Sequence, residues 1–210
     1  MRSQVKTVFF ERYVFHVWPE VYEPAEDSFL FAENLTCNAG DTVLDVGTGC
    51  GILAIVAAAK ASHVLALDIN PFAVRCAKEN AKLNHVSDKM LFLQGNLFAP
   101  LKNTVKFDLI LFNAPYLPVK HEKADLGLER AWAGGKRGRQ LIDSFIYTSP
   151  LHLKMGGRVL LLQSSLSGIE ETLRGFETLG LKAKVVAEQS LPFFESIALI
   201  EAMKNSATRN

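Results

Sequence analysis

Two kinds of hydrophobic pattern alternate along the chain. Short apolar runs such as DTVLDVG and HVLALD are typical of strands that are buried on both faces of a sheet. Longer segments such as NPFAVRCAKENAKL have apolar positions every three to four residues, as on one face of a helix. The patterns predict strands over residues 41–47, 63–68, 90–95, 106–113 and 157–164. They predict helices over 52–61, 70–83, 139–153 and 168–180, and Pro150 is expected to break the third of these. This alternation indicates a mostly parallel α/β sheet with helices on both faces.

The last two apolar segments, at 182–189 and 195–203, are joined only by a few residues around Pro192. This connection is too short for a crossover helix, so we expect an antiparallel pair that completes a seven-stranded sheet. Residues 1–22 are expected to form an N-terminal arm with a short strand pair. We expect one domain over residues 23–203 and a frayed tail over 204–210.

Composition narrows the classes of function. The 210 residues include 23 Lys and Arg against 22 Asp and Glu, a net charge of +1, which gives no general attraction for nucleic acids. The three cysteines, Cys37, Cys50 and Cys76, contain no Cys-x-x-Cys pair, so neither a disulfide framework nor a zinc site is expected. No window reaches the length of a transmembrane span. The sequence therefore predicts a cytoplasmic protein without membrane contact.

A glycine-rich loop, LDVGTGCG (44–51), follows the first long strand and leads into a helix. Glycines let a backbone turn sharply and approach a ligand closely, and dinucleotide enzymes have similar loops. Here the order is Gly-x-Gly-x-Gly, beginning with Gly47 and Gly49, and Asp45 lies two residues before the first glycine. A carboxylate there would repel a pyrophosphate but not an amine or a sulfonium. The loop therefore favours a cationic ligand such as S-adenosylmethionine.

Polar positions also follow the next two strands. Asp68 ends the second, where a carboxylate can accept hydrogen bonds from both ribose hydroxyls. Asn96 and Leu97 follow the third; the asparagine can accept from an adenine amino group while the leucine packs on the ring. The structural alternatives are helix-capping acids at positions 45 and 68 and an ordinary turn asparagine at 96.

The fourth strand ends in the loop NAPYLP. Asn113 offers a side-chain oxygen, and Ala114 precedes a proline, which favours an extended backbone with a free carbonyl. Two such acceptors can hold both hydrogens of a planar –NH2 group and stabilise the positive charge that grows on its nitrogen. The ring of Tyr116 can pack on the planar group. The alternative is that Pro115 only stiffens a turn that ends the strand.

Together, LDVGTGCG, LDINP and NAPY resemble the class I S-adenosylmethionine-dependent methyltransferases that have an Asn-Pro-Pro-Tyr type motif. The stretches 21–30 and 131–145 are more specific. They resemble the HemK-like protein glutamine N5-methyltransferases, which modify the Gly-Gly-Gln glutamine of class I peptide-chain release factors. The similarity runs from about residue 20 to the end. Because there is no room for an extra N-terminal helical domain, the chain resembles the archaeal and eukaryotic branch, which implies a Rossmann-like three-layer sandwich.

The resemblance implies S-adenosylmethionine as cofactor, with contacts from Ser28, Asp45, Gly47, Gly49, Asp68, Ile69, Asn96, Leu97 and Asn113. It implies that the substrate glutamine is held by Asn113, Ala114, Pro115 and Tyr116. Two positions depart from the family. Alanine replaces the usual proline at 114, which should cost roughly 0.4–1 kcal/mol of backbone preorganisation. Asparagine replaces the usual aspartate at 96, which should weaken adenine binding.

The resemblance also implies a partner, because members of this branch often work with a small zinc-containing activator that pairs with an edge of the sheet. The apolar strand 90–95 is the expected edge. The alternative is that its own helices cover this strand. The basic loop 133–139, with Lys136, Arg137 and Arg139, is expected either to steer a substrate protein or RNA, or to be a solvated loop.

Two other functions stay open from sequence. A nucleic-acid adenine N6-methyltransferase would use the same chemistry, since adenine also has a planar –NH2 group. The charge balance and the lack of room for a target-recognition domain argue against it. The second is a non-catalytic protein that binds the cofactor and whose substrate-binding motif is weakened by the alanine at position 114.

Overall fold

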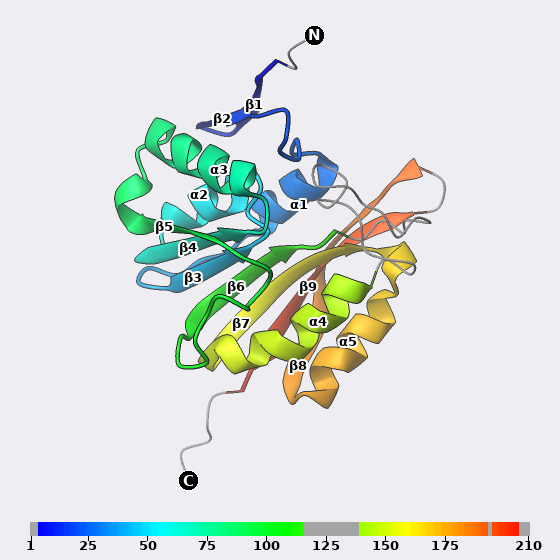
Figure 1. The fold of residues 1–210 in the computed structure, drawn as a ribbon. Helices are drawn as coiled ribbons and strands as arrows, with labels where there is room; N and C mark the ends of the chain where they lie inside the picture. Colours follow the sequence, from blue (N-terminus) through cyan, green and yellow to red (C-terminus); the bar gives the residue numbers. More distant parts are fainter. Residues whose placement is uncertain (1–3, 116–138, 193–194, 206–210) are drawn as a thin grey trace.

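A seven-stranded sheet forms the centre of the computed structural model, which describes residues 4–115, 139–192 and 195–205 (Figure 1). Its order is β5-β4-β3-β6-β7-β9-β8. The strands are β3 (Thr42–Val46), β4 (His63–Asp68), β5 (Met90–Gln94), β6 (Phe107–Asn113), β7 (Leu153–Ser164), β8 (Leu181–Ser190) and β9 (Ser196–Lys204). The first five in this order pair in parallel, and β9 is antiparallel to both of its neighbours. The predicted α/β fold with an antiparallel C-terminal pair is confirmed.

The order of the strands creates a switch point beside β3. The chain leaves β3 for β4 and then β5, and it returns to pair β6 with the other side of β3. In open parallel sheets, a crevice for ligands lies beyond the carboxyl ends of the strands at such a reversal. The polar residues that end β4 and β6, Asp68 and Asn113, therefore meet at one edge of the sheet, beside the loop that follows β3.

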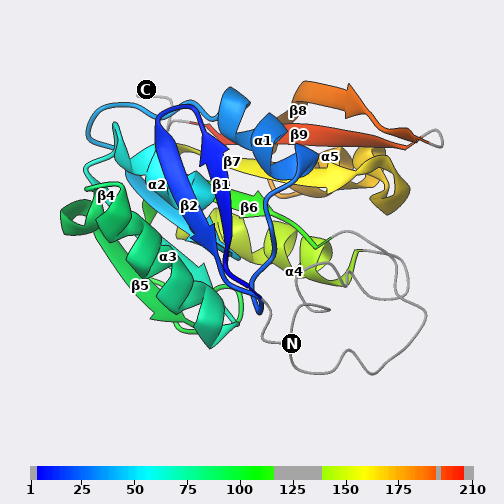
Figure 2. The same cartoon turned by 90° about the horizontal axis from the view of Figure 1, so that it is seen from above.

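Helices cover both faces of the sheet (Figures 1 and 2). On one face lie α1 (Glu26–Asn34), α2 (Ile52–Ala58) and α3 (Pro71–Leu83), and on the other lie α4 (Gln140–Thr148) and α5 (Ile169–Thr178). Short 3-10 turns are η1 (Ser87–Lys89), η3 (Ser149–His152) and η4 (Ser165–Ser167). The result is the expected three-layer sandwich.

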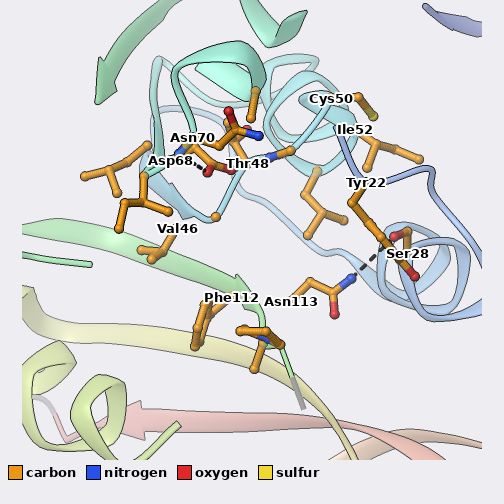
Figure 3. Close-up of a pocket in the computed structure, with 18 of the residues that line it drawn as sticks. Tyr22, Ser28, Val46, Thr48, Cys50, Ile52, Asp68, Asn70, Phe112 and Asn113 are labelled. Carbon is orange, nitrogen blue, oxygen red and sulfur yellow. Dashed lines mark hydrogen bonds between the residues drawn. The ribbon is translucent and has the colours of Figure 1, made fainter. Parts of the chain in front are cut away.

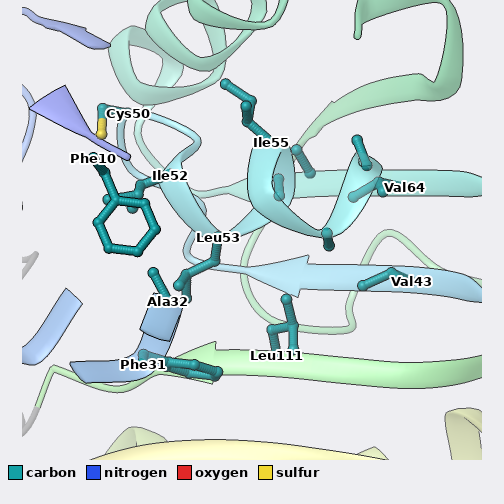
Figure 4. Close-up of a cluster of buried hydrophobic side chains, with 14 of the residues drawn as sticks. Phe10, Phe31, Ala32, Val43, Cys50, Ile52, Leu53, Ile55, Val64 and Leu111 are labelled. Carbon is teal, nitrogen blue, oxygen red and sulfur yellow. The ribbon is translucent and has the colours of Figure 1, made fainter. Parts of the chain in front are cut away.

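Each central strand supplies side chains to two hydrophobic cores. In β6, Leu109 and Leu111 belong to the core under α1 and α2, which Figure 4 shows. The alternate residues Ile110 and Phe112 belong to the core beside α4 and α5, where the ring of Phe112 stacks on Phe145 at 4.5 Å between centroids. This two-sided burial explains why the strand is apolar throughout rather than alternating.

The segment 139–153, predicted as helical with a break at Pro150, is α4 followed by the 3-10 turn η3, which contains Pro150. The start of the next strand differs from the prediction. Strand β7 begins at Leu153, four residues before its predicted start at 157. The two glycines at 156 and 157 are typical of a loop, which is why the sequence pattern predicts a later start. In the structure they form an irregular part of the strand: Gly156 has φ +76°, and a Cβ on Gly157 would lie 3.0 Å from the carbonyl of Phe107.

The predicted N-terminal strand pair is present as β1 (Lys6–Phe10) and β2 (Tyr13–Val17), a separate antiparallel sheet. Two asparagines hold it in place: Asn80 on α3, and Asn84, which caps the C-terminal end of that helix.

Asn84 accepts a hydrogen bond from the backbone N–H of Val14 (3.0 Å) and donates one to its carbonyl (2.8 Å). Asn80 does the same for His16, at 2.8 and 2.9 Å. The rise along one helical turn is close to the distance between alternate residues of a strand. The side chains of Asn80 and Asn84 can therefore bond to alternate residues of β2, as the backbone of a third strand would.

Asn80 also donates to the carbonyl of Cys50 (2.9 Å), so one amide joins β2, α3 and the glycine-rich loop. We expect Asn80→Ala to lower the free energy of unfolding by about 2–4 kcal/mol, because three buried hydrogen bonds are lost. Equilibrium unfolding in urea measures this. Glu79→Ala, exposed on the same helix, is the control. Equal stability of the two variants would show that the hydrogen bonds of Asn80 contribute nothing to the free energy of unfolding.

Candidate active site

A cavity of about 420 Å³ opens at the carboxyl ends of β3, β4, β5 and β6 (Figure 3). Most of the predicted site residues line it. They are Ser28, Gly47, Gly49, Asp68, Ile69, Asn96, Leu97, Asn113, Ala114 and Pro115. Asp45 does not line the cavity, and Tyr116 lies outside the described residues. The segments that meet here are 20–28, the glycine-rich loop and the ends of β4, β5 and β6.

The glycine-rich loop turns from β3 into α2 through left-handed backbone conformations. Gly47, Gly49 and Gly51 have φ values of +71°, +57° and +91°, which disfavour other residues. The N–H of Gly47 donates to the carbonyl of Leu67 (2.8 Å), so the loop is held over the end of β4. A Cβ on Gly51 would lie 3.0 Å from the Cβ of Ala77, and only glycine lets α3 pack this closely.

Asp68 is the last residue of β4, and its carboxylate lies under this loop. Oδ2 accepts from the N–H of Gly49 and Oδ1 from the N–H of Asn70, both at 2.9 Å. Burial raises its pKa, while these N–H donors act in the opposite direction. Each carboxylate oxygen has a second lone pair, so Asp68 can still accept hydrogen bonds from a diol in the cavity.

Asp45 lies beneath the loop rather than in the cavity wall, with 1% of its surface exposed. Its Oδ2 accepts from Thr48 Oγ (2.7 Å), and its Oδ1 has no partner among the described residues. Burial raises the pKa of this carboxyl to about 7, and the charge of Asp68 acts in the same direction. Asp45 therefore changes charge near neutral pH.

Ile69 and Leu97 add apolar surface to the cavity from the positions after β4 and β5. The two strand ends are tied by a hydrogen bond from the N–H of Gly95 to the carbonyl of Asp68 (2.9 Å). Leu97 has φ +46°, a left-handed conformation that is uncommon for a leucine and that fixes the direction of its side chain. Asn96 is exposed at the rim. Ile69 and Leu97 therefore give the cavity an apolar surface on which a flat ring can pack, beside the exposed side-chain amide of Asn96.

Asn113 ends β6 at the switch point, where α1 meets the sheet. Its Nδ2 donates to Oδ2 of Asp27 (3.0 Å) and to Oγ of Ser28 (3.3 Å), and Figure 3 shows Asn113 pointing toward Ser28. Its Oδ1 is buried and has no partner among the described residues. Sequence reasoning missed Asp27, because an acid in the first turn of a helix is also what the helix dipole favours.

The residue after Asn113 is as buried as the strand. Ala114 is 3% exposed, and its N–H donates to the carbonyl of Leu162 on β7 (3.1 Å), so the loop begins in register with the sheet. Pro115 lines the cavity. The second acceptor that we predict, the carbonyl of Ala114, thus belongs to a residue with a fixed N–H.

The cavity lining is acidic. Glu20, Asp27 and Asp68 line it, and no Lys, Arg or His is among the lining residues that the structure describes. A ligand with several phosphates would be repelled, and a ligand with net positive charge is attracted. Together with the diol acceptor at Asp68 and the apolar contacts, this donor and acceptor set fits S-adenosylmethionine.

The interpretation of residues 133–139 as a basic loop is wrong for Arg139. Its side chain is buried, and it donates to the carbonyls of Ser167 and Gly168 and to Oδ1 of Asp143 (2.7 Å). It joins the start of α4 to the start of α5 and is not available to a partner. Lys136 and Arg137 lie outside the described residues.

The described part of the chain contains no cluster of three or more His, Cys, Asp or Glu residues that could hold a metal ion. None of its helices combines the length and the apolar character needed to cross a membrane.

Comparisons with known proteins give consistent results. The family model described as ribosomal protein L11 methyltransferase (PrmA) matches residues 28–117. A Methanocaldococcus jannaschii protein, provisionally named a protein N5-glutamine methyltransferase, is 47% identical over 188 residues, which cover 89% of this chain and 93% of that protein. Methyltransferase HEMK2 of Homo sapiens is 34% identical over 174 residues, 78% of this chain and 80% of that protein. A release factor glutamine methyltransferase of Aquifex aeolicus is 34% identical over 56% of this chain and 43% of that protein.

Solved structures share the fold. The Mtq2–Trm112 complex of E. cuniculi, described as responsible for methylation of the eRF1 translation termination factor, superposes with a TM-score of 0.66, covering 89% of this chain and 99% of that one at 21% identity. The tRNA m1G37 methyltransferase of M. jannaschii gives 0.68 over 96% of this chain and 57% of that one, at 20% identity. These likenesses show a class I methyltransferase fold.

The raised pKa of Asp45 predicts a pH dependence of stability. Between about pH 4 and 7 the unfolded chain has this carboxyl ionised while the folded chain keeps it protonated, so the folded state binds more protons and its stability falls as pH rises. Asp45→Asn removes this effect. We expect its free energy of unfolding to rise relative to the wild type by about 1–4 kcal/mol between pH 4.5 and 7.5. Guanidinium unfolding at both pH values measures it; a constant difference would contradict the burial argument.

Proposed function

Because the chain belongs to the protein N5-glutamine methyltransferase family, we propose that it transfers a methyl group from S-adenosylmethionine to the amide nitrogen of a glutamine side chain. The substrate is the glutamine of the Gly-Gly-Gln motif in a class I peptide-chain release factor, and the enzyme works in the cytoplasm, where such factors act. Oδ1 of Asn113, a buried acceptor without a partner among the described residues, carries the proposal. Leaving it unpaired costs about 1–3 kcal/mol, which a substrate N–H can recover.

The chemical task explains why an acceptor is needed. An amide nitrogen is a poor nucleophile because its lone pair is delocalised, and it becomes positively charged as a fourth bond forms. Oδ1 of Asn113 and the carbonyl of Ala114 each accept one hydrogen of the –NH2 group, hold its plane and stabilise that charge. Tyr116, which lies outside the described residues, would supply a ring to pack on the face of the amide. After transfer the nitrogen gives one proton to solvent, so no side chain has to act as a strong base.

The cofactor site is built from the acidic and apolar lining of the cavity. When bound, S-adenosylmethionine supplies a sulfonium methyl group, whose S–C bond breaks as the new N–C bond forms. Asp68 would accept from the ribose hydroxyls, and Leu97 and Ile69, which line the cavity, would pack against the adenine. Asn96 accepts from the adenine amino group at the rim. Asp45 does not contact the cofactor directly. It accepts a hydrogen bond from Thr48 and so supports the glycine-rich loop that would contact the cofactor.

A labelled-methyl assay tests the substrate. We expect transfer to an archaeal or eukaryotic release factor and none to its Gly-Gly-Gln variant with Gln→Ala. A DNA duplex is offered in parallel, because an adenine N6-methyltransferase would label it. Label that stays on the Gln→Ala factor, or that goes to DNA alone, would refute the proposal. No label on any of the three, despite confirmed cofactor binding and an added activator, would indicate a non-catalytic binding protein.

The acceptor role of Asn113 has its own test in the same assay. Asn113→Ala should reduce kcat by roughly 10²- to 10³-fold, the usual cost of removing a group that stabilises charge in the transition state. Affinity for the cofactor, measured by calorimetry, should change much less, because the ribose and adenine contacts remain. A variant that keeps full activity would exclude the side-chain oxygen as an acceptor.

We also propose that a small zinc-containing activator pairs with β5. The two edges of the sheet differ. Edge strand β8 carries Lys182 and Lys184 and a register shift after Val185, features that prevent pairing with another chain. Edge strand β5 has no charged residue, and Leu91 is 66% exposed. Unprotected apolar edges are sites where a further strand can add.

Charge on β5 should weaken this complex. We expect Leu91→Glu to lower the affinity for a Trm112-like activator at least tenfold, because the added carboxylate must be buried against an apolar surface. Val185→Glu, on the opposite edge, is the matched control and should bind normally. Light scattering after gel filtration gives the stoichiometry and calorimetry the affinity. Wild-type affinity of the Leu91→Glu variant would place the activator elsewhere.

A further inference from the structure

We propose that Asp27 is a positioning residue for the methyl transfer, because it sets which end of the Asn113 side-chain amide faces the substrate. The inference rests on the function proposed above and goes beyond it. Sequence motifs identify Asn113 but not the orientation of its amide. The oxygen and nitrogen of an asparagine amide have nearly the same shape, so packing alone does not distinguish them.

The contacts of Asn113 decide the orientation. A carboxylate only accepts hydrogen bonds, so the group that lies 3.0 Å from Oδ2 of Asp27 has to be the –NH2 of Asn113. The reverse orientation would place two oxygens in contact in a buried site. The second –NH2 hydrogen points to Oγ of Ser28 at 3.3 Å. Both hydrogens are then used, and Oδ1 is left as the free end.

Ser28 is itself oriented by the same carboxylate. Its hydroxyl donates to Oδ1 of Asp27 (3.2 Å), so a lone pair of Oγ is what remains for Asn113. The hydrogen bonds among Asp27, Ser28 and Asn113 are thus compatible with only one orientation of the Asn113 amide. Neither residue of α1 is more than 5% exposed, so both side chains are largely withdrawn from solvent.

Asp27 is held rigidly enough to serve this purpose. Its Oδ1 also accepts from the backbone N–H of Ser28 (2.6 Å) and from the hydroxyl of Tyr22 (3.2 Å). The carboxylate therefore cannot rotate away from Asn113 without breaking bonds to two other residues. Because it lies on the first turn of α1, the position of that helix on the sheet is transmitted to the end of β6.

The charge of Asp27 adds an electronic effect to the geometric one. A carboxylate that accepts from an amide N–H shifts electron density toward the amide oxygen, and hydrogen bonds in a chain strengthen one another in a buried site. Oδ1 of Asn113 thereby becomes a stronger acceptor for a nitrogen that grows positive. The carboxylate never touches the substrate in this arrangement; it acts through the asparagine.

The test compares Asp27→Asn with Glu26→Gln, a matched control that removes the neighbouring, exposed acid from the same helical turn. We expect Asp27→Asn to reduce kcat by roughly 10²- to 10³-fold. Its affinity for S-adenosylhomocysteine and its thermal unfolding temperature should stay close to the wild type. Glu26→Gln should behave as the wild type throughout. A normal kcat in Asp27→Asn, or equal losses of kcat, ligand affinity and thermal stability, would overturn the proposal.

A double variant separates positioning from an independent role. If Asp27 acts through Asn113, Asp27→Asn should cause no further loss of kcat in an Asn113→Ala background, whereas independent roles predict that the losses multiply. The wild type assayed on the release factor is the reference for both. An inactive wild type would count against the proposed function, while additive losses in an active enzyme count against the positioning role.

A measurement on the wild type covers the case in which Asp27→Asn does not fold. The side-chain –NH2 signals of Asn113, assigned in NMR spectra by their absence in Asn113→Ala, should exchange slowly with solvent because both hydrogens are bonded and buried. The –NH2 signals of exposed Asn103 provide the comparison. Exchange at the same rate in both side chains would show that the contact with Asp27 does not form.

Discussion

Strand β3 pairs in parallel with β4 on one side and with β6 on the other, and this backbone pairing decides where each polar group of the site lies. Asp68 and Asn113 are separated by 45 positions in the sequence, yet each ends a strand next to β3. Parallel direction places both ends at the same edge, and the reversal of strand order keeps the space between them open. The glycine-rich loop and α1 then close that space from the remaining sides. Without this pairing, the same side chains would be scattered over the surface.

The site is costly for the folded chain, and the surrounding structure compensates in specific ways. Asp68 is buried, but two backbone N–H groups bind its carboxylate. Burial raises the pKa of Asp45, and only one of its two oxygens has a hydrogen-bond partner among the described residues. The glycine-rich loop depends on glycine at position 51 and on the hydrogen bond from the Asn80 side chain to the carbonyl of Cys50. The apolar cores on both faces of the sheet provide the stability against which these polar groups are held.

Much of this arrangement could be predicted from sequence because local patterns determine it. The apolar runs predicted the strands, and the glycine-rich loop and Asp68, which were predicted to share a site, line the same cavity. The contacts that were missed are between residues far apart in the chain. Asp27 looks like an ordinary first-turn acid until α1 is placed beside β6. Arg139 looks like a solvated loop cation until the carbonyls at the start of α5 surround it. Asn80 looks like a polar position on a helix surface, but β2 covers it.

The acidic lining of the cavity has a consequence for turnover. S-adenosylmethionine enters with one net positive charge, and transfer of the methyl group leaves a neutral thioether. The attraction exerted by Glu20, Asp27 and Asp68 on the spent molecule is therefore weaker than on the fresh one, with no movement of the protein. The same carboxylates that recruit the methyl donor thus favour its replacement after each cycle. Catalysis itself removes the net charge that these carboxylates attract, and this loss of attraction favours release of the product.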